Sequence, residues 1–394
     1  MGTDIRIVLK SGKDQSVMRR HPWLFSGAIK KIHGNPSDGD LVNVYNNKDE
    51  FLAIGHYQNG TIAVRILDFN RDHLDEDFWK FRFADAYRLR KTLGLTDSSD
   101  TNVYRLIHAE GDNLPGLIAD YYNGHVVIQL HSSGMNRNIK EIFSNLQQLY
   151  KDKIVTVYNK SETTLPFNER DQGGNAFLLG NSTDTIVTEN ALKFHVNWSE
   201  GQKTGFFIDQ RENRKLLKEY AYERDVLNLF CYSGAFSVYA LSGGARKVHS
   251  VDSSAKIIEL AVKNSNLNFP GARHEAFTED AFKFMDGKIG LYDMIVLDPP
   301  AFAKHQNVLH NALQGYKRLN QRALEIIRKG GIIFTFSCSQ VVTKENFRKS
   351  VFAAAANARR SVKILHQLGQ PSDHPVNIYH PEGEYLKGLV LYVD

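Results

Sequence analysis

The sequence predicts an α/β chain of three modules: a small N-terminal β-barrel, a central α+β module and a C-terminal, doubly wound, largely parallel sheet. Short apolar runs separated by turn residues fill the N-terminal part, as in small barrels. Strands and helices then mix without regular order, and from Trp198 onward they alternate, as a parallel sheet requires. We predict module boundaries at 1–73, 74–189 and 190–394.

Composition and cysteine count narrow the class of protein. Of 394 residues, 42% are hydrophobic and 24% charged, which is ordinary for globular domains. No apolar run reaches the roughly 18–20 residues that span a bilayer, and the charged N-terminus is unlike a secretory signal. Cys231 and Cys338 are the only cysteines, and the 15 histidines lack metal-ligand spacing, so we expect no metal and a cytoplasmic location. The net charge of +5 permits a polyanionic partner.

The N-terminal module combines predicted strands with one stretch of cations and aromatics. The strands are expected at 5–9, 40–45, 51–57 and 61–67. Between the first two, Arg19 and Arg20 meet Trp23 across a proline, a combination that suits phosphate contact and base stacking. The alternative is that Trp23 belongs to the barrel core and the arginines to a solvated turn.

The central module is predicted from one clear helix and several strands. An amphipathic helix covers 75–93 and ends at Gly94. Further elements are three strands with an Asn123-Gly124 hairpin turn, a helix at 139–150, a strand at 154–158 and a hairpin about Glu189-Asn190. We predict a polar loop at 161–178.

The C-terminal module begins with a βαβ unit from Asp225 to Asp252. Val226–Phe230 is a buried-strand pattern, a tight turn follows, and a short helix leads to a second strand that ends in Asp252. A carboxylate there suits ribose hydroxyls. The turn has one glycine, Gly234, instead of G-x-G-x-x-G, which favours a ligand without phosphates such as S-adenosylmethionine. The alternative is a βαβ unit without a ligand.

The remaining elements continue the alternation. We expect helices at 254–266, 315–329 and 344–359, and strands at 274–277, 292–297, 332–336, 362–365 and 389–393. The order of the last strands allows an antiparallel closing pair, which distinguishes a methyltransferase sheet from a dinucleotide-binding sheet.

Three further strand ends carry polar or reactive residues. Asp280 either accepts from an adenine amino group or caps the next helix. Asp298 precedes two prolines that end the strand and fix the carboxylate in a cleft. Cys338 is placed like a nucleophile, although buried cysteines are often inert, whereas Cys231 is expected to pack beside the ligand. Residues 201–214 are predicted to form a loop over the cofactor and do not match a Walker loop.

Together these motifs resemble the RlmI-type family of 23S ribosomal RNA cytosine-5 methyltransferases over essentially the whole chain. The similar stretches are G-Q-K-T-G-F-F-I-D-Q-R-E-N-R, N-L-F-C-Y-S-G-A-F-S, D-P-P-A-F, F-S-C-S, H-P-W-L-F-S-G-A-I and E-G-D-N-L-P-G-L-I-A-D-Y-Y. The resemblance implies a PUA barrel, a central α+β domain of EEHEE type and a class I Rossmann-like methyltransferase domain, often as a homodimer. Ala301 and Gln340 depart from the family, which commonly has lysine and glycine there.

The resemblance also implies the chemistry: S-adenosylmethionine as methyl donor, S-adenosylhomocysteine as product, Cys338 as nucleophile and Asp298 as the group that holds the pyrimidine edge. The candidate cofactor contacts are Phe206, Asp209, Gln210, Arg211, Asn228, Phe230, Ser233, Gly234, Asp252, Ser253, Asp280 and Asp298. The candidate contacts to ribosomal RNA are Arg19, Arg20, Trp23, Lys203, Pro299, Phe302 and Lys304. Two alternatives stay open: a methyltransferase acting on an amine or ring nitrogen of a purine, and a non-catalytic RNA-binding or ribosome-assembly factor.

Overall fold

The computed structural model describes residues 2–167, 169, 174–303 and 305–394. The chain forms two compact units. Unit 1 consists of Met1–Thr185, Asn197–Phe206 and Ser372–Gly383, and unit 2 of Ile186–Val196, Phe207–Pro371 and Glu384–Asp394. No helix within the described ranges is long and apolar enough to cross a membrane.

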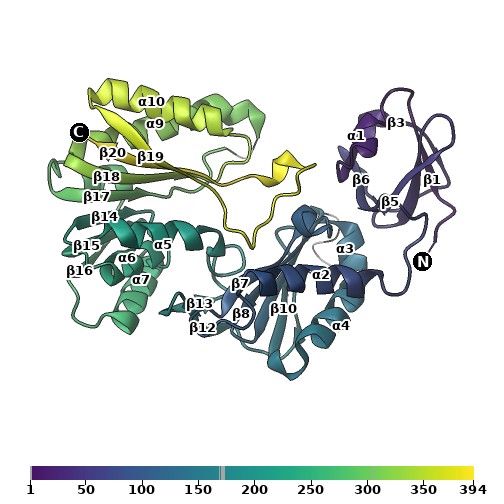
Figure 1. Cartoon of the computed structure of the whole chain (residues 1–394), viewed down its shortest axis with the longest axis horizontal. Helices are drawn as coiled ribbons and strands as arrows, with labels where there is room; N and C mark the ends of the chain where they lie inside the picture. The colour runs from purple at the N-terminus through teal and green to yellow at the C-terminus, as the bar shows by residue number, and fades with distance from the viewer. Residues whose placement is uncertain (1, 168, 170–173, 304) are drawn as a thin grey trace. The chain divides into compact units, whose positions relative to one another are not determined.

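The first part of unit 1 is a six-stranded sheet curled into a small barrel, purple in Figure 1. Its strand order is β2-β6-β5-β4-β1-β3, in which only the β1–β4 pairing is parallel. The strands are β1 (Arg6–Leu9), β2 (Trp23–Phe25), β3 (Ile29–His33), β4 (Leu41–Tyr45), β5 (Phe51–Tyr57) and β6 (Ile62–Asp68), with the short helix α1 (Gln15–Met18) between β1 and β2. Buried aliphatic residues such as Ile7, Leu24 and Val44 fill the interior. The four strands predicted for this barrel are confirmed, and β2 and β3 were not expected.

The second part of unit 1 is a five-stranded sheet of order β11-β10-β9-β8-β7 with helices packed on it. The strands are β7 (Val103–His108), β8 (Leu117–Tyr122), β9 (His125–Leu130), β10 (Thr156–Lys160) and β11 (Asn175–Leu179); the helices are α2 (Phe78–Thr92), α3 (Ser133–Arg137) and α4 (Ile139–Tyr150). Asn123 and Gly124 both have positive φ and join β8 to β9, which confirms the predicted hairpin. The predicted loop at 161–178 is wrong at its end, because β11 pairs there with β10. This edge strand is mostly exposed and therefore has no apolar alternation to reveal it.

The segment Ser372–Gly383 belongs to unit 1 although the sequence placed it with the C-terminal module. Buried charges explain this difference. The carbonyl of Asp373 accepts from Arg90 at 2.7 Å, and its Oδ2 accepts from the backbone N–H of Arg105 at 3.0 Å. Arg90 also forms a buried bidentate pair with Asp112. Such charges are costly to bury unless they are paired, and these pairs join residues far apart in the sequence.

Unit 2 contains a seven-stranded sheet of order β16-β15-β14-β17-β18-β20-β19. The strands are β14 (Asp225–Leu229), β15 (Lys247–Asp252), β16 (His274–Thr278), β17 (Tyr292–Leu297), β18 (Ile327–Ser337), β19 (Val362–Leu368) and β20 (Lys387–Val393). The pairings from β16 to β18 are parallel, whereas β20 pairs antiparallel with both β18 and β19. The antiparallel closing pair that the sequence left open is therefore present.

Helices cover both faces of this sheet (Figure 1). One face carries α5 (Arg211–Tyr220), α6 (Ala235–Ser242) and α7 (Ala255–Asn268); the other carries α9 (Leu309–Ile326) and α10 (Lys344–Ala358), with the short α8 (Ala281–Met285) nearby. The helix predicted at 315–329 begins and ends earlier than expected, because Ile327 already pairs with Tyr292 of β17. The strand order reverses at β14, between β15 and β17, where doubly wound sheets bind ligands.

The hairpin predicted about Glu189-Asn190 is also confirmed. It consists of β12 (Asp184–Glu189) and β13 (Leu192–Asn197), with Asn190 and Ala191 at positive φ in the turn. Within unit 2 the Glu189 carboxylate accepts from Arg214 of α5 in a buried bidentate pair, with contacts of 2.9 and 2.8 Å. This pair anchors the helix that follows the 207–210 segment.

Candidate active site

The carboxyl ends of four parallel strands form one edge of the unit 2 sheet. In the observed register Leu229 lies beside both Val251 and Leu297, and Leu297 lies beside Thr335. The residues just beyond these positions therefore gather along a single edge. They are the β14 turn, Asp252, Asp298 and Cys338, as the sequence predicted.

The turn after β14 has an unusual backbone. Phe230, Tyr232 and Gly234 all have positive φ, of 57°, 44° and 70°. A Cβ on Gly234 would lie 2.8 Å from the Cβ of Ala261 in α7, so only glycine fits without a shift. Non-glycine residues hold such angles at a cost that proteins commonly bear at functional sites. The turn thus brings backbone close to the space outside the strand ends.

Asp252 is fixed by the same turn. Its Oδ2 accepts from the backbone N–H of Tyr232 at 3.3 Å, and its Oδ1 accepts from Ser254 at 3.2 Å. The residue is partly exposed and its neighbour Ser253 is exposed. A carboxylate held at the tip of the second strand suits acceptance from ribose hydroxyls.

Asp280 forms the helix cap that the sequence left open. Its Oδ1 accepts from the backbone N–H groups of Phe282 at 2.9 Å and Lys283 at 3.1 Å, at the start of α8. The residue is also exposed. Because a carboxylate accepts through two oxygens, the predicted contact with an adenine amino group stays a prediction.

Asn228, near the end of β14, and Ser233, in the turn, are both buried. Asn228 Nδ2 donates to Ser237 of α6 at 2.9 Å, while its Oδ1 has no hydrogen-bond partner within the described ranges. The carbonyl of Ser233 accepts from Asn264 of α7 at 2.8 Å. Both residues fasten the turn to its covering helices, and their direct contact with a cofactor stays a prediction.

The segment before α5 connects to two strand ends of unit 2. Asp209 Oδ2 accepts from the hydroxyl of Tyr385 at 2.7 Å, and Gln210 Nε2 donates to Asp298 Oδ2 at 3.1 Å. Asn213 donates to Gln210 Oε1 at 2.6 Å. The structure thus brings Asp209, Gln210 and Asp298 together, with the buried Arg211 next along the chain, and their contact with a cofactor stays a prediction.

Several residues of this site were missed by the sequence reasoning. Phe207 packs edge-on against Tyr232, with ring centroids 4.7 Å apart, and Tyr385 and Asn213 orient the predicted polar residues. Phe207 lies inside a predicted motif and could have been chosen for its aromatic ring. Tyr385 has no such signal, because it lies in an irregular segment just before β20.

Cys338 lies directly after β18 and next to the Asp298-Pro299 turn. Its Sγ is 4.0 Å from the carbonyl oxygen of Pro299, and the residue is partly exposed. The following residue, Ser339, is buried; its Oγ accepts from the backbone N–H of Ala303 at 3.3 Å and lies 2.9 Å from the hydroxyl of Tyr316. The two predicted catalytic residues therefore follow the ends of the adjacent strands β17 and β18, in two turns that contact each other.

The other thiol is in a different environment. Cys231 is 6% exposed and packs with Ile258 and Ala261. Burial, and secondarily the charge of Asp252, raise the pKa of the Cys231 thiol well above its usual range. It therefore stays protonated at neutral pH, which agrees with the packing role expected for it.

The donor set fits S-adenosylmethionine better than a nucleotide with phosphates. The backbone at Gly234 and the carboxylate of Asp252 would contact the adenosine part of the cofactor. Asp209 and Gln210 supply further polar groups to the site. Carboxylates at these positions would repel a pyrophosphate. No group of three or more His, Cys, Asp or Glu residues suited to a metal occurs in the part of the chain that the structure describes.

Two predicted contacts, Phe206 and Lys203, belong to unit 1. Phe206 is buried there, and Lys203 is exposed with a φ of 50°. Their roles stay predictions. Pro299 is buried, and Phe302 packs on Tyr316 with ring centroids 4.6 Å apart. Lys304 lies outside the described residues.

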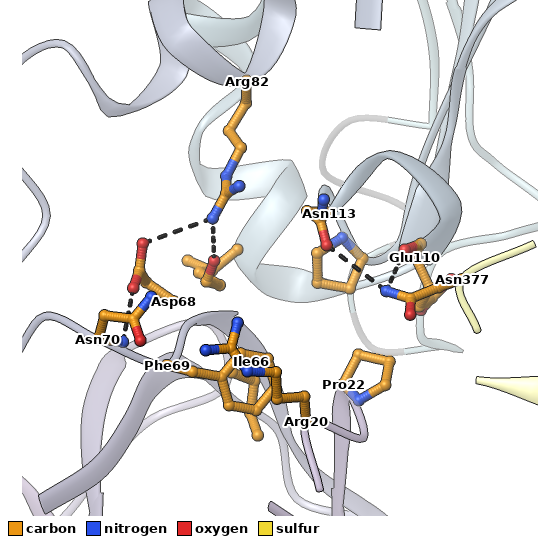
Figure 2. A pocket seen from close by; sticks show the side chains of 12 residues that line it. Arg20, Pro22, Ile66, Asp68, Phe69, Asn70, Arg82, Glu110, Asn113 and Asn377 are labelled. Atoms are coloured by element: carbon orange, nitrogen blue, oxygen red, sulfur yellow. Dashed lines mark hydrogen bonds and ion pairs between the residues drawn. The ribbon is translucent and has the colours of Figure 1, made fainter. Parts of the chain in front are cut away.

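A pocket of about 210 Å³ opens in unit 1 beside the predicted RNA-binding stretch (Figure 2). Exposed Arg20 lines it with a φ of 62°, and Arg82 donates across it to the carbonyl of Leu67 at 2.8 Å. The other lining residues are Pro22, Ile66, Leu67, Asp68, Phe69, Asn70, Glu110, Asn113, Pro115 and Asn377. Arg19 is exposed nearby in the sequence. At about 210 Å³, the pocket is smaller than the pockets that hold drug-sized ligands.

Trp23 is less exposed to solvent than Arg19 and Arg20. Its Nε1 donates to Glu110 at 2.8 Å, and its ring lies edge-on against His380, with centroids 4.3 Å apart. The residue is only partly exposed. The predicted base stacking on Trp23 stays a prediction that would require one face of this ring.

Comparisons with known proteins agree with the fold. Residues 104–382 match the family model described as S-adenosylmethionine-dependent methyltransferase, and residues 7–69 match the PUA-like domain. Proteins named ribosomal RNA large subunit methyltransferase I are 39% identical in Tolumonas auensis and 38% identical in Pseudoalteromonas atlantica; the alignments cover 98% of this chain and 98% and 99% of the relatives.

Solved structures are also similar over nearly the whole chain. A putative SAM-dependent methyltransferase from Streptococcus mutans is 25% identical with a TM-score of 0.84, covering 98% of this chain and 100% of that one. A putative methyltransferase complexed with SAH has the same identity and coverage and a TM-score of 0.85.

Proposed function

The chain belongs to the ribosomal RNA large subunit methyltransferase I family, and from this premise we propose that it methylates large-subunit ribosomal RNA with S-adenosylmethionine. We propose further that the product is 5-methylcytosine and that Cys338 is the nucleophile. The observation that carries the second proposal is the partly exposed thiol of Cys338, 4.0 Å from the Pro299 carbonyl and beside Asp298. A purine-directed enzyme of this fold would need no thiol at that position.

Carbon 5 of cytosine is a weak nucleophile, so the chain must activate it. The Cys338 thiolate adds to carbon 6, and carbon 5 thereby gains the electron density to accept a methyl group. S-adenosylmethionine, when bound, supplies that electrophilic methyl group. A base then removes the carbon-5 proton, and the bond between carbon 6 and sulfur breaks to restore the aromatic ring and the thiolate.

Asp298 would hold the base during these steps. Gln210 fixes its carboxylate by donating to Oδ2 at 3.1 Å, and the prolines that follow keep the turn rigid. A carboxyl group at the N3 and N4 edge of cytosine can keep N3 protonated, which stabilises the charge that develops on the adduct. The target base must leave its stack to reach such a site, which costs a few kcal/mol and least in loops.

Unit 1 is proposed to bind the flanking RNA. Exposed Arg19 and Arg20 supply positive charge, and the pocket of about 210 Å³ that Arg20 lines has donors and acceptors for an unpaired nucleotide. Lys203 is a further exposed cation of this unit. Replacing Arg19 and Arg20 by alanine should weaken RNA binding by reducing phosphate contacts, and should flatten its salt dependence.

The test of the reaction uses the two cysteines as a matched pair. Wild type, Cys338→Ala and Cys231→Ala are incubated with labelled S-adenosylmethionine and ribosomal RNA stripped of its modifications, and the labelled nucleoside is identified. We expect 5-methylcytidine with wild type and Cys231→Ala, and none with Cys338→Ala. Label in a purine that persists in Cys338→Ala would support the purine-directed alternative. No label with RNA or with intact subunits, and no cofactor binding, would support a non-catalytic binding factor.

The resemblance to the family also supports a cytoplasmic homodimer. Sedimentation equilibrium of the purified chain over a range of concentrations tests the dimer, since a single monomeric species throughout would contradict it. Fractionation of cells into cytoplasm and envelope tests the location.

A further inference from the structure

A buried lysine lies against the turn that carries Cys338. Lys387 is the first residue of β20 and pairs directly with Ser337, the last residue of β18. It is 3% exposed, and its Nζ donates to the carbonyl of Ser339 at 2.6 Å and to that of Tyr385 at 2.7 Å. The ammonium group therefore holds the Ser339–Gln340 peptide, one residue beyond Cys338, and neither the sequence motifs nor the proposed mechanism uses it.

A lysine here needs an explanation, because burying an ammonium group is costly. Burial lowers the pKa of Lys387 from its ordinary value to about 8, and the nearby Cys338 and Glu384 oppose this shift, while Lys344 adds to it. Lys344 and Glu384 pair with each other at the exposed surface, so their charges largely cancel. An apolar side chain of similar length would fill the same space without this cost.

Two described residues near the thiol, Asp298 and Tyr316, carry no positive charge. Asp298, which precedes Pro299, carries a negative charge that disfavours a thiolate. Tyr316 contacts Ser339 and is kept neutral, because burial raises the pKa of its hydroxyl. Lys387, by contrast, is a buried cation bound to this turn.

We propose that Lys387 is a positioning residue for the nucleophile: its buried ammonium group fixes the Ser339–Gln340 peptide next to Cys338 and stabilises the thiolate form of Cys338. A positive charge close to a thiol favours the thiolate, and the low dielectric of a buried site strengthens that effect. This inference rests on the proposed function in one respect, namely that the Cys338 thiolate attacks the base. The electrostatic effect on the thiol itself does not depend on any RNA substrate.

The test measures the thiol directly. Alkylation of Cys338 by iodoacetamide follows the thiolate, so its rate against pH gives the pH of half-maximal reaction, with the modified peptide identified by mass spectrometry. Lys387→Met removes the charge but keeps the length, Lys387→Arg keeps the charge, and Lys344→Met removes an exposed charge as the matched control. We expect the half-maximal pH to rise by about one to two units in Lys387→Met. Lys387→Arg and Lys344→Met should stay close to wild type.

An unchanged half-maximal pH in a folded Lys387→Met protein would overturn the inference, with folding checked by S-adenosylmethionine binding and thermal unfolding. If that variant does not fold, the alkylation of Cys338 in the wild-type protein tests the inference. Half-maximal alkylation below about 8.5, the value of a free cysteine, supports a stabilised thiolate, and a value at or above it overturns one. The outcome is separate from the proposed function. Methyl transfer that persists in Cys338→Ala would contradict the proposed nucleophile, even if Lys387→Met shifts the alkylation of Cys338. Conversely, Cys338 can be required for methyl transfer while Lys387→Met leaves its alkylation unchanged.

Discussion

The turns after β14 and β18 occupy equivalent places in one sheet, yet their cysteines differ in exposure and in the charge of the nearby groups. Cys231 and Cys338 each lie just beyond the carboxyl end of a parallel strand. The first is buried and close to the negative charge of Asp252, which with burial raises its pKa. The second is partly exposed, and the nearby buried cation is Lys387.

Position in the fold alone therefore does not make a thiol reactive. A reactive cysteine needs access and a neighbouring positive charge, whereas a structural one needs neither. The β14 turn holds its backbone at positive φ and orients Asp252, which is what a cofactor cradle requires. The β18 turn is braced by Lys387 and Tyr316 around an accessible sulfur, which is what a nucleophile requires.

The largest expected effect would separate the two thiols completely. RNA containing 5-fluorocytidine should form a denaturation-resistant adduct with wild type and Cys231→Ala, because fluorine at carbon 5 prevents the proton removal that releases the sulfur. Cys338→Ala should form none. Gel electrophoresis under denaturing conditions with labelled RNA measures this. An adduct with Cys338→Ala would break the contrast between the two turns.

A smaller but still large difference is expected in thiol chemistry without RNA. In native protein at neutral pH, Cys338 should react with an aromatic disulfide reagent at least about 100-fold faster than Cys231, because only Cys338 combines access with a favourable charge. In denaturant the two rates should become equal. Absorbance at the wavelength of the released thiolate, with each single Cys→Ala variant, assigns the two phases. Equal native rates would contradict the contrast.

The backbone of the β14 turn should be sensitive to a single methyl group. Gly234→Ala meets both a φ of 70° and a close contact with Ala261, so we expect its free energy of unfolding to fall by about 2–3 kcal/mol. Gly287→Ala is the matched control, since its φ is 71° but nothing lies within 4 Å; it should cost about 1 kcal/mol. Urea unfolding measures both. Equal losses would mean that the contact with α7 contributes nothing.

The smallest expected effect concerns the cofactor carboxylate. Asp252→Asn keeps the shape but loses the charge, so S-adenosylmethionine affinity should fall about tenfold, the difference between a charged and a neutral hydrogen bond. Glu275→Gln, at an exposed carboxylate on the adjacent β16, should leave affinity unchanged. Titration calorimetry measures both. An unchanged affinity in Asp252→Asn would contradict the prediction that Asp252 binds the cofactor.

Local patterns in the sequence determined much of this protein. The βαβ unit, the strand that ends in Asp252, the strand that Asp298 follows and the placement of Cys338 could be predicted, because buried strands, turns and helices each have a short-range signature. The family resemblance and the absence of a phosphate-binding glycine pattern then pointed to S-adenosylmethionine. The edge strand β11 was not predicted, since an exposed strand lacks the alternation of apolar and polar residues that identifies a half-buried strand.

The distant residues that support the site could be identified only from the folded chain. Tyr385 orients Asp209, Lys387 holds the turn of Cys338, and Asp373 joins Ser372–Gly383 to unit 1 through Arg90. Each of these contacts spans more than a hundred residues of sequence except that of Lys387 with Ser339, which crosses from β18 to β20. None of these contacts produces a periodic pattern in the sequence. A buried polar or charged group can pair with any suitable group that the fold brings near, so the sequence shows each residue without showing its partner.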